Sequence, residues 1–484
     1  MRSFAALLCL GLIAPTISAQ PTPEPVDGVV VFKLTLSPAA APQPVSKTYL
    51  LPEYRDELPG EKLSGFMKCF MEQQTFFNNE NSLKREEWNK LPLDLLPKDM
   101  RTQAGLMGGM GYSPKYATMP VMLDQAARFN RLEWNDYTNF RHDGAFALLP
   151  EIQGLRMLAQ VLAVRFRGEV SNGEFERAFV TAKTLFGLGK MLEQHPTMIG
   201  NLVGIAILQI GLNCVQEMMA QPGCPNLYWA FADLPTPLLS IRRGVEGERM
   251  FLTTQLNSLH DRERPLTPSE LDKQMIYIEE LTKIDGEKTA FDKALSGPKV
   301  RYTMQAGDEP RMTAARVRLT EQAGIPAQTV QLYSPLQVAM ADDLLQFEIY
   351  RDEITKWANI PYFQASGLKA DDEKMKSLKS KLVLAPMLMA SVAKVKVAET
   401  RLTQKAAYLR TLEALRLHAH KHGGTLPKTL AEIEVPLPND PYTGKPFGYE
   451  LKGDVAFLKG ADTFSAFSPT GKAYSVEYEI RMRK

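Results

Sequence analysis

Apolar residues recur every three or four positions through most of the chain after residue 60, which is the spacing of one face of an α-helix. Leu155, Leu158, Leu162 and Phe166 mark one such helix, and a second begins after the turn Ser171-Asn172-Gly173. Two helices joined by a short turn form an αα-hairpin. A spacing typical of tetratricopeptide units occurs here once, without a second copy, so the pattern favours a single hairpin over a repeat array.

Alternation of apolar and polar residues with a period of two lies nearer the start of the chain. Phe32, Leu34 and Leu36 alternate with polar residues, which is the pattern of a half-buried β-strand. A second short strand is predicted within residues 45–51. Prolines are frequent between residues 20 and 44, so this part is predicted to be an extended linker that carries short strands.

Residues 202–212 are apolar with almost no interruption, and Gly200 and Gly204 have the spacing of small residues found in membrane helices. Asn201 and Gln209 interrupt this segment, and the run is about half the length that a membrane span requires. A helix that is apolar on all sides is typical of the centre of a large helical core. We therefore expect a buried helix here, and no transmembrane span.

The starts of two later helices can be recognised from their first residues. Thr267-Pro268-Ser269-Glu270 combines a capping box with proline at the first helical position. Another helix is predicted after Ser334-Pro335, and its apolar stripe contains Arg351 in place of an apolar residue. A half-buried arginine needs a carboxylate or carbonyl partner. A structural ion pair is favoured, and an anion-binding site is the other open interpretation.

The first 19 residues have the three parts of a secretory signal peptide. Arg2 provides a positive charge, residues 4–13 form an apolar core, and Ile17-Ser18-Ala19 provides a cleavage site of small residues. The core is too short to span a bilayer. We expect cleavage after Ala19 and export to the periplasm, the cell envelope or the outside of the cell.

The net charge and the cysteines exclude some classes of protein. The chain has 57 Lys and Arg residues against 55 Asp and Glu residues, a balance that gives no electrostatic reason to expect nucleic acid as a partner. Three cysteines remain after loss of the signal peptide, so they cannot all pair within one chain. Cys214 and Cys224 are close enough for a possible disulfide across a turn, although burial as free thiols is favoured.

The sequence lacks the motifs of the common catalytic and cofactor-binding sites: it contains no HExxH, CxxC, phosphate-binding loop or G-x-S-x-G. We therefore assign no catalytic residue, no metal and no cofactor. His418 and His422 stand one helical turn apart, the spacing of a two-ligand metal face. Histidines in the last turn of a helix also interact favourably with the negative end of its dipole, and this interpretation is favoured.

Aromatic and charged residues that stand close together are the remaining candidates for recognition. Such residues line binding grooves, but they also close junctions between helices, and the sequence leaves both interpretations open. The candidate binding residues are Arg128, Trp134, Asp136, Trp229, Arg351 and Asp352.

The last hundred residues resemble a known kind of subunit. A helical run from about Lys381 to His422 ends in Gly423-Gly424 and is followed by turn-rich segments that include Asp440-Pro441. This order resembles the soluble part of type IV pilin and type II secretion pseudopilin subunits. The resemblance implies a long helix with a small antiparallel sheet.

This tail departs from the pilin pattern in two ways. A functional prepilin carries its apolar helix at the mature N-terminus, whereas the comparable helix begins here near Leu382, which argues against assembly into a pilus. Major pseudopilins carry an acidic calcium loop near the end, whereas residues 467–473 contain no aspartate. Calcium sites need several oxygen ligands, so we predict none in this segment.

Four blocks elsewhere resemble a second group of proteins. They are Leu50-Leu51-Pro52-Glu53, residues 148–156, residues 225–230 and Arg351-Asp352-Glu353. They look like recurring blocks of an uncharacterised family of exported proteins from planctomycete-type bacteria. The resemblance implies a shared, mostly helical fold and export, and it supplies no catalytic residue.

The predicted fold class is predominantly α-helical: a helical-hairpin body with a small N-terminal β element and a C-terminal α+β, pilin-like module. Its predicted parts are a signal peptide (residues 1–19), a Pro-rich linker with short strands (20–60), a helical domain (61–380) and a long helix with a small antiparallel sheet (381–484).

Two functions from different classes fit these features. The favoured one is a non-catalytic cell-envelope interaction or scaffold protein, whose partner is an unknown envelope protein or ligand. The alternative is an envelope hydrolase that uses carboxylates in a cleft of the helical domain, with Glu246 and Glu248 or Asp342 and Asp343 as its acids. Acids that lie so close together on a helix point in different directions and usually belong to a solvated face.

Overall fold

The computed structural model describes residues 28–72, 79–96, 119–134, 149–284, 297–365, 382–384, 392–461 and 475–483. The signal peptide, Asp136 and residues 467–473 lie outside these ranges. The described chain is mostly helical, with a small mixed sheet, and it forms two compact units. Unit 1 contains the described residues from Val245 to Ala393, and unit 2 contains all the others.

This division differs from the predicted domain boundaries. The predicted helical domain, residues 61–380, is divided between Gly244 and Val245, and its first part belongs to the same unit as the C-terminal segment. The strand near the start of the chain belongs to this unit as well, because it pairs with the last strand of the C-terminal sheet. The N-terminal β element is therefore part of unit 2 and not a separate part of the fold.

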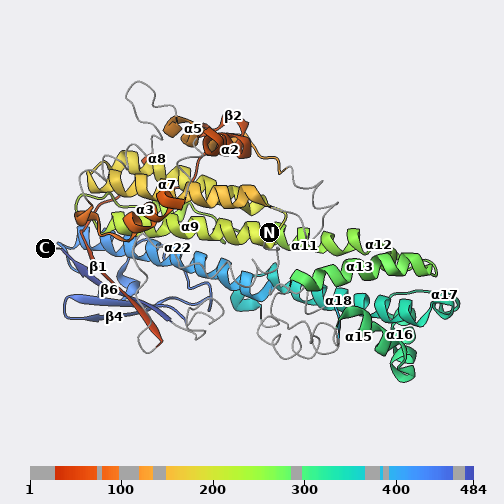
Figure 1. Ribbon diagram of the computed structural model, residues 1–484. Coiled ribbons are helices and arrows are strands. Elements are labelled where there is room, and N and C mark those ends of the chain that lie inside the picture. Colours follow the sequence, from red (N-terminus) through yellow and green to blue (C-terminus); the bar gives the residue numbers. More distant parts are fainter. Residues whose placement is uncertain are drawn as a thin grey trace. The chain divides into compact units, whose positions relative to one another are not determined.

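The sheet of unit 2 has the strand order β1-β6-β5-β4 (Figure 1). Its strands are β1 (Val29–Leu36), β4 (Gly448–Lys452), β5 (Val455–Lys459) and β6 (Ser475–Met482). The predicted strand at Phe32 to Leu36 is confirmed. The antiparallel pairing predicted within residues 381–484 is found for β4, β5 and β6. The sheet as a whole is mixed, because β1 runs parallel to β6, with Leu34 opposite Ile480.

The second strand predicted near the start is wrong. Residues 45–47 form a short 3-10 helix, η1 (Val45–Lys47), after the extended residue Pro44. Prolines at positions 42 and 44 cannot donate backbone hydrogen bonds, which disfavours a strand at this point.

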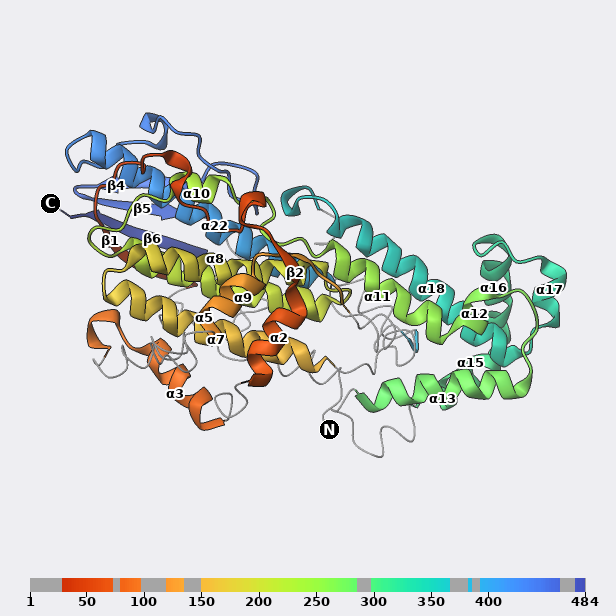
Figure 2. The same cartoon turned by 90° about the horizontal axis from the view of Figure 1, so that it is seen from above.

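The long helix α22 (Val392–Lys421) lies along the sheet in unit 2, as Figures 1 and 2 show. The ring of Tyr408 stacks on Phe447 at 4.5 Å and lies 4.9 Å from the ring of Tyr478 in β6. Its hydroxyl donates a hydrogen bond of 2.7 Å to the carbonyl of Val476. Aromatic packing therefore connects the helix to two parts of the sheet region.

The helix α22 ends where the glycines predict, but it begins at Val392 and not near Lys381. Leu382, Val383 and Leu384 are not helical and lie in the core of unit 1. Gly423 and Gly424 both have positive φ angles, of 59° and 87°, which only glycine adopts at little cost. The amide of Gly424 donates to the carbonyl of Ala419, so a carbonyl of the last turn is satisfied. His418 and His422 stack at 4.1 Å across this end.

The predicted hairpin is confirmed as α7 (Pro150–Ser171) and α8 (Phe175–Met191), with Gly173 at a φ of 75° in the turn. The next helix, α9 (Met198–Met219), packs against both. By length and composition α9 is apolar enough to cross a membrane, but 78% of its most apolar window is buried inside the protein. Core helices of soluble proteins have the same length and composition.

The rest of unit 2 consists of short elements. In a second, two-stranded sheet β2 (Leu58–Glu61) runs parallel to β3 (Phe129–Arg131). The remaining elements are η2 (Tyr54–Asp56), α2 (Lys62–Glu72), α3 (Asn79–Lys90), η4 (Leu93–Leu95), α5 (Met119–Ala126), η6 (Leu192–Gln194), α10 (Tyr228–Ala232) and η8 (Leu430–Glu432).

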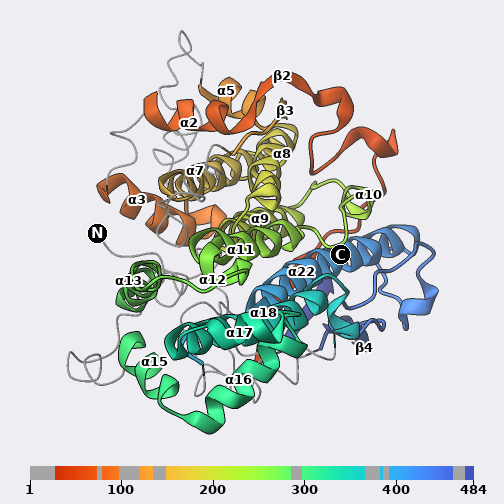
Figure 3. The ribbon, with the colours of Figure 1, turned by 90° about the vertical axis from the view of Figure 1, so that its right-hand side faces the viewer.

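The described secondary-structure elements of unit 1 are all helices (Figure 3). It begins within α11 (Arg242–Gln255), after the unit boundary at Val245. Its other elements are α12 (Asn257–Asp261), α13 (Pro268–Ile284), α15 (Pro298–Ala306), α16 (Glu309–Glu321), α17 (Ala327–Leu332), α18 (Pro335–Ala358) and η7 (Tyr362–Gln364). One apolar core joins α12, α13, α15, α16, α17 and α18 and includes Leu382, Val383 and Leu384.

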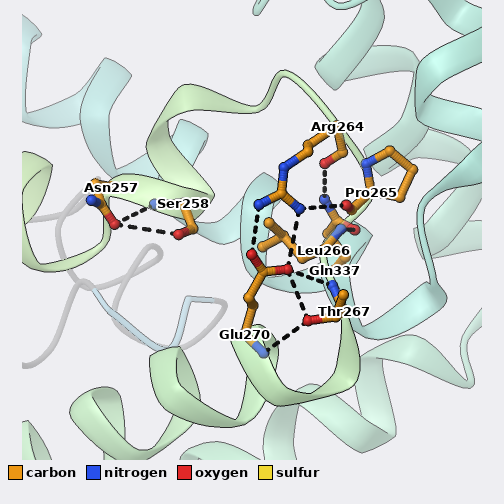
Figure 4. A network of polar contacts seen from close by, with 8 residues as sticks. All are labelled: Asn257, Ser258, Arg264, Pro265, Leu266, Thr267, Glu270 and Gln337. Carbon is orange, nitrogen blue, oxygen red and sulfur yellow. Dashed lines mark hydrogen bonds and ion pairs between the residues drawn. The ribbon is translucent and has the colours of Figure 1, made fainter.

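The capping box at the start of α13 is confirmed (Figure 4). The backbone amide of Thr267 donates to the Glu270 carboxylate at 2.7 Å, and the amide of Glu270 donates back to the Thr267 hydroxyl at 3.3 Å. Arg264 also binds this carboxylate, at 2.6 Å. Hydrogen bonds from Arg264 and Thr267 lower the pKa of Glu270 to about 2, so the carboxylate stays ionised and caps the helix at neutral pH.

The helix predicted after Ser334-Pro335 is confirmed as α18, and the Ser334 side chain accepts a hydrogen bond from the amide of Gln337. The predicted apolar stripe is buried at Met340, Leu344 and Phe347. Arg351 lies on the same stripe with only 16% of its side chain exposed. The sequence pattern therefore identified both the helix and its half-buried arginine.

Candidate functional site

The five described candidate binding residues belong to two different units, and Asp136 lies outside the described residues. Trp134 and Trp229 belong to unit 2, as does Arg128, whereas Arg351 and Asp352 belong to unit 1. Arg351 and Asp352 contact each other, with 3.1 Å between Nε and Oδ1.

Arg128 and Trp134 close junctions in unit 2. The backbone carbonyl of Arg128 accepts a hydrogen bond from Leu58 in the small parallel sheet. Trp134 is 6% exposed, and its indole packs edge-on against the imidazole of His195 at 4.6 Å. A side chain with so little exposed surface has almost no area to offer a partner, so Trp134 acts in packing.

Trp229 differs from these residues because 42% of it is exposed. It lies in α10, a short helix beside α22 in Figures 2 and 3. The ring of Trp229 meets the ring of Tyr228 edge-on, with 5.0 Å between the centroids. Val45 in η1, which packs against α10, is also exposed, at 38%. The surface that contains the exposed side chains of Trp229 and Val45 is called the Trp229 surface below.

The residue beside Trp229 is held by α22. The ring of Tyr228 is completely buried and is covered by the guanidinium of Arg410 at 5.1 Å. Arg410 also donates hydrogen bonds to the Tyr228 hydroxyl at 3.0 Å and to the carbonyl of Pro436 at 3.2 Å. Tyr228 donates to the same carbonyl. The start of α10 is therefore fixed by three contacts with distant parts of unit 2.

A buried ion pair in α22 holds the loop that leads into α10. Arg416 and Glu413 in α22 are both 0% exposed and bind each other at 2.8 and 3.0 Å. Arg416 also donates to the carbonyls of Cys224, at 2.6 Å, and of Ser37, at the end of β1, at 2.9 Å. Asn226 donates to the Glu413 carbonyl at 2.9 Å. One guanidinium thus connects three segments that are far apart in sequence.

Burial dominates the electrostatics of this ion pair. Loss of solvation raises the pKa of Glu413, although the charge of Arg416 opposes this change. A buried pair of this kind adds little stability compared with a well-packed apolar pair, but removal of one partner leaves an uncompensated charge. The pair therefore fixes the geometry of the loop more than it adds to overall stability.

Asp342 and Asp343 do not lie on a solvated face as the sequence suggested: they are 2% and 1% exposed. The two carboxylates do point in different directions. Asp342 binds Arg318 with two hydrogen bonds of 2.7 Å. Both aspartates are buried because α15 and α16 pack on α18. The helix α16 supplies Arg318 as the partner of Asp342, and α15 supplies Tyr302 as a partner of Asp343.

Asp343 has the altered acidity of a catalytic carboxyl group but is enclosed by its own chain. It accepts hydrogen bonds from the amides of Val383 and Leu384, at 2.8 and 2.9 Å, and from the Tyr302 hydroxyl, at 2.9 Å. Burial raises the pKa of Asp343 to about 6, against the effect of these hydrogen bonds. Its contacts hold residues 382–384 in the core of unit 1.

A buried lysine is the second strongly altered group. Lys405 in α22 is 8% exposed, and burial lowers its pKa to about 7. Its amine donates to Gln216 of α9 and, at 2.8 Å, to the Tyr478 hydroxyl of β6. It also lies 4.7 Å from the centre of the Phe32 ring in β1. Lys405 therefore sits where α9, α22 and the sheet meet.

The described cysteines are buried thiols. Cys214 and Cys224 are free and buried, so the possible disulfide between them is not formed. Cys214 faces the packed side of α9, and the Cys224 backbone is held by Arg416. Burial raises the pKa of the Cys224 thiol to about 12 and also raises that of Cys214. The described chain contains no cluster of three or more potential metal ligands.

Comparison of the chain with protein-family models, with curated proteins and with solved structures finds no match. Its function must therefore be inferred from its own residues.

Proposed function

We propose that the protein is an exported, non-catalytic interaction or scaffold protein of the cell envelope, which recognises an envelope protein or ligand through the Trp229 surface. The exposure of Trp229 in α10, directly after an anchored loop, is the observation that carries this proposal. Tryptophan is enriched among the residues that dominate binding energy at interfaces. A fixed loop also loses little conformational entropy when a partner binds.

The hydrolase alternative names four acids, of which two are enclosed within unit 1. Asp342 and Asp343 are enclosed and bound to partners within unit 1. Glu246 is exposed, on a helix whose neighbouring position, Glu248, is half-buried. A catalytic acid must come within hydrogen-bond reach of its substrate, and the two buried aspartates meet only their own chain.

The C-terminal part of unit 2 supports the proposal of a pilin-derived folding module. A long helix, α22, packs on the antiparallel strands β4, β5 and β6 through Tyr408 and Lys405. The added parallel strand β1 is a departure from the resemblance. We infer that this module acts as a support, because its helix carries the contacts that hold the loop before Trp229.

Export predicts a defined mature N-terminus. When the full-length chain is produced in a bacterium with a general secretion pathway, the protein in the periplasmic or extracellular fraction should begin at Gln20. N-terminal sequencing of that fraction measures this directly. Recovery of the uncleaved chain in the cytoplasm would contradict the localisation.

A partner should be captured from the Trp229 surface by photocrosslinking. A photoreactive amino acid at Asp233, which is exposed one turn after Trp229, should form crosslinks in intact cells that produce the full chain. The same amino acid at Phe363, which is 43% exposed in unit 1, is the matched control. We expect crosslinked species that are specific to position 233 and that fall at least tenfold when Trp229→Ala is added.

The crosslinking experiment can also reject the proposal. Crosslinked species that are the same from positions 233 and 363 would indicate general contact with crowded neighbours. Species that persist unchanged in the Trp229→Ala variant would show that Trp229 does not anchor the partner.

A further inference from the structure

Two histidines lie against each other at the C-terminal end of α22, in unit 2. His418 is half-buried and His422 is exposed, and their rings stack with 4.1 Å between the centroids and 28° between the planes. The amide of His422 still donates the helical hydrogen bond to the carbonyl of His418, at 3.1 Å. Two imidazoles four positions apart lie on one side of a helix and can bind the same metal ion.

The chain after α22 returns to the last turn of the helix and adds two carboxylates to this pair. The side chains of Glu432 and Glu434 interact electrostatically with the imidazole of His418, and Glu434 interacts with His422 as well. The carboxylate of Glu432 also accepts a hydrogen bond of 3.1 Å from the amide of Lys428, which holds the returning segment. Helical spacing in the sequence does not reveal these acids, because they lie beyond the end of α22.

The backbone of the returning segment orients one of the two rings. A ring N–H of His418 donates to the backbone carbonyl of Glu432. A neutral imidazole has one N–H donor and one nitrogen with a lone pair, so this bond leaves the second nitrogen of His418 able to bind a metal. Metal-binding histidines usually donate their other ring N–H to a carbonyl or a carboxylate, which fixes the ring. His418 therefore has the hydrogen bond expected of a metal ligand.

The charges around the two histidines are compatible with a bound cation. Lys421, which lies between them in the sequence, binds the carboxylate of Glu434, so its positive charge is compensated. The C-terminal end of a helix carries a partial negative charge, which stabilises a cation placed there. Both the helix end and the two acids therefore favour a metal ion beside the exposed ring of His422.

We propose that His418 and His422 bind one divalent transition-metal ion, copper(II) most tightly, and that Glu432 and Glu434 surround it with negative charge. Imidazole nitrogen suits copper, nickel and zinc, and affinity for such ligands is highest for copper(II). The described residues contain no group of three potential ligands, so two side chains bind the ion and water completes its coordination. This site does not use Trp229, so it is separate from the proposed recognition surface.

Titration calorimetry of the purified full-length protein with copper(II) chloride, and separately with nickel(II) and magnesium chloride, measures the affinity. Copper(II) should bind more tightly than nickel(II), and magnesium should not bind at this site. His418→Ala and His422→Ala should each bind copper(II) at least tenfold more weakly than the parent. His420→Ala is the matched control, because it removes an exposed histidine from the same turn, and it should stay within about twofold.

The charge around the ion is tested by two variants that should act in opposite directions. Lys421→Met removes a positive charge and frees the Glu434 carboxylate, so it should bind copper(II) at least threefold more tightly. Glu434→Gln should bind it at least threefold more weakly. Equal affinities of both variants would show that these side chains do not act on the metal and would overturn this part of the proposal.

Electron paramagnetic resonance identifies the ligands of the bound copper(II). The parent should show coupling to two imidazole nitrogens, and each of His418→Ala and His422→Ala should show coupling to one. Equal copper affinities for the parent, these two variants and His420→Ala would indicate an adventitious ion only and would overturn the proposal. If a histidine variant fails to fold, the parent spectrum decides, since a signal without two imidazole nitrogens also overturns the proposal.

Discussion

Arg416→Met should lower the free energy of unfolding of unit 2 by about 3–5 kcal/mol, because it leaves the Glu413 carboxylate buried without its partner. It also leaves the carbonyls of Ser37 and Cys224 without their donor. Urea unfolding measures the loss. Hydrogen exchange should show the largest local increase in exchange rate at residues 224–229, the loop before α10 and the first two residues of that helix.

Two further variants test the cause of this loss. Arg416→Met combined with Glu413→Leu should recover more than half of the lost stability, because the unpaired charge is removed. Arg177→Met is the control: it breaks an exposed pair with Glu174 and should change stability by less than about 1 kcal/mol. A double variant that is no more stable than Arg416→Met would show that the buried charge is not the cause.

Lys405→Met should stabilise unit 2 at neutral pH relative to the parent, and the gain should shrink as the pH rises. The pKa of Lys405 falls from 10.5 to about 7 in the folded protein, so between these values the unfolded chain holds a proton that the folded chain lacks. Stability of the parent therefore rises with pH in this window, by roughly 1.4 kcal/mol per pH unit. The methionine variant lacks this contribution.

Hydrogen exchange of amides in α22 and β6, corrected for intrinsic rates, measures the opening free energy from pH 7 to pH 9.5. The difference between Lys405→Met and the parent should be on the order of 3 kcal/mol larger at pH 7 than at pH 9.5. The bond between the Tyr478 hydroxyl and Gln216, of 2.9 Å, remains in the variant, so neither group loses all its partners. Lys421→Met, on the exposed end of α22, should show no such change, and a flat difference for Lys405 would contradict the account.

Local patterns in the sequence predicted the helices and strands better than they predicted which of these elements pair with each other. The hairpin, the capping box at Glu270 and the stripe around Arg351 depend on residues within two or three turns, and all were found. The alternation at Phe32 to Leu36 fixes which side chains face inward. It contains no information about the pairing with β6, more than 400 residues away, and so the domain boundaries differed from the prediction.

The burial of charged residues also depends on packing between elements that are distant in the sequence. On α22, Leu402, Lys405, Leu409, Leu412 and Arg416 follow one another at gaps of three and four, so both cations lie on the apolar stripe. A charged residue on an apolar stripe is also the pattern that identified Arg351. The same pattern in α22 predicts that Lys405 and Arg416 are buried, but this helix was interpreted only as part of a pilin-like tail. Asp342 and Asp343 gave no comparable signal, because burial on several sides of α18 depends on how unit 1 packs.

The affinity of the crosslinked partner for variants at position 229 tests the central claim most directly. The dissociation constant of the purified full-length protein should rise at least tenfold in Trp229→Ala, which is the size expected for a residue that dominates an interface. It should stay within about twofold in Phe363→Ala, a change of similarly exposed aromatic surface. Equal affinities for the parent and Trp229→Ala would contradict the proposal that this surface performs recognition.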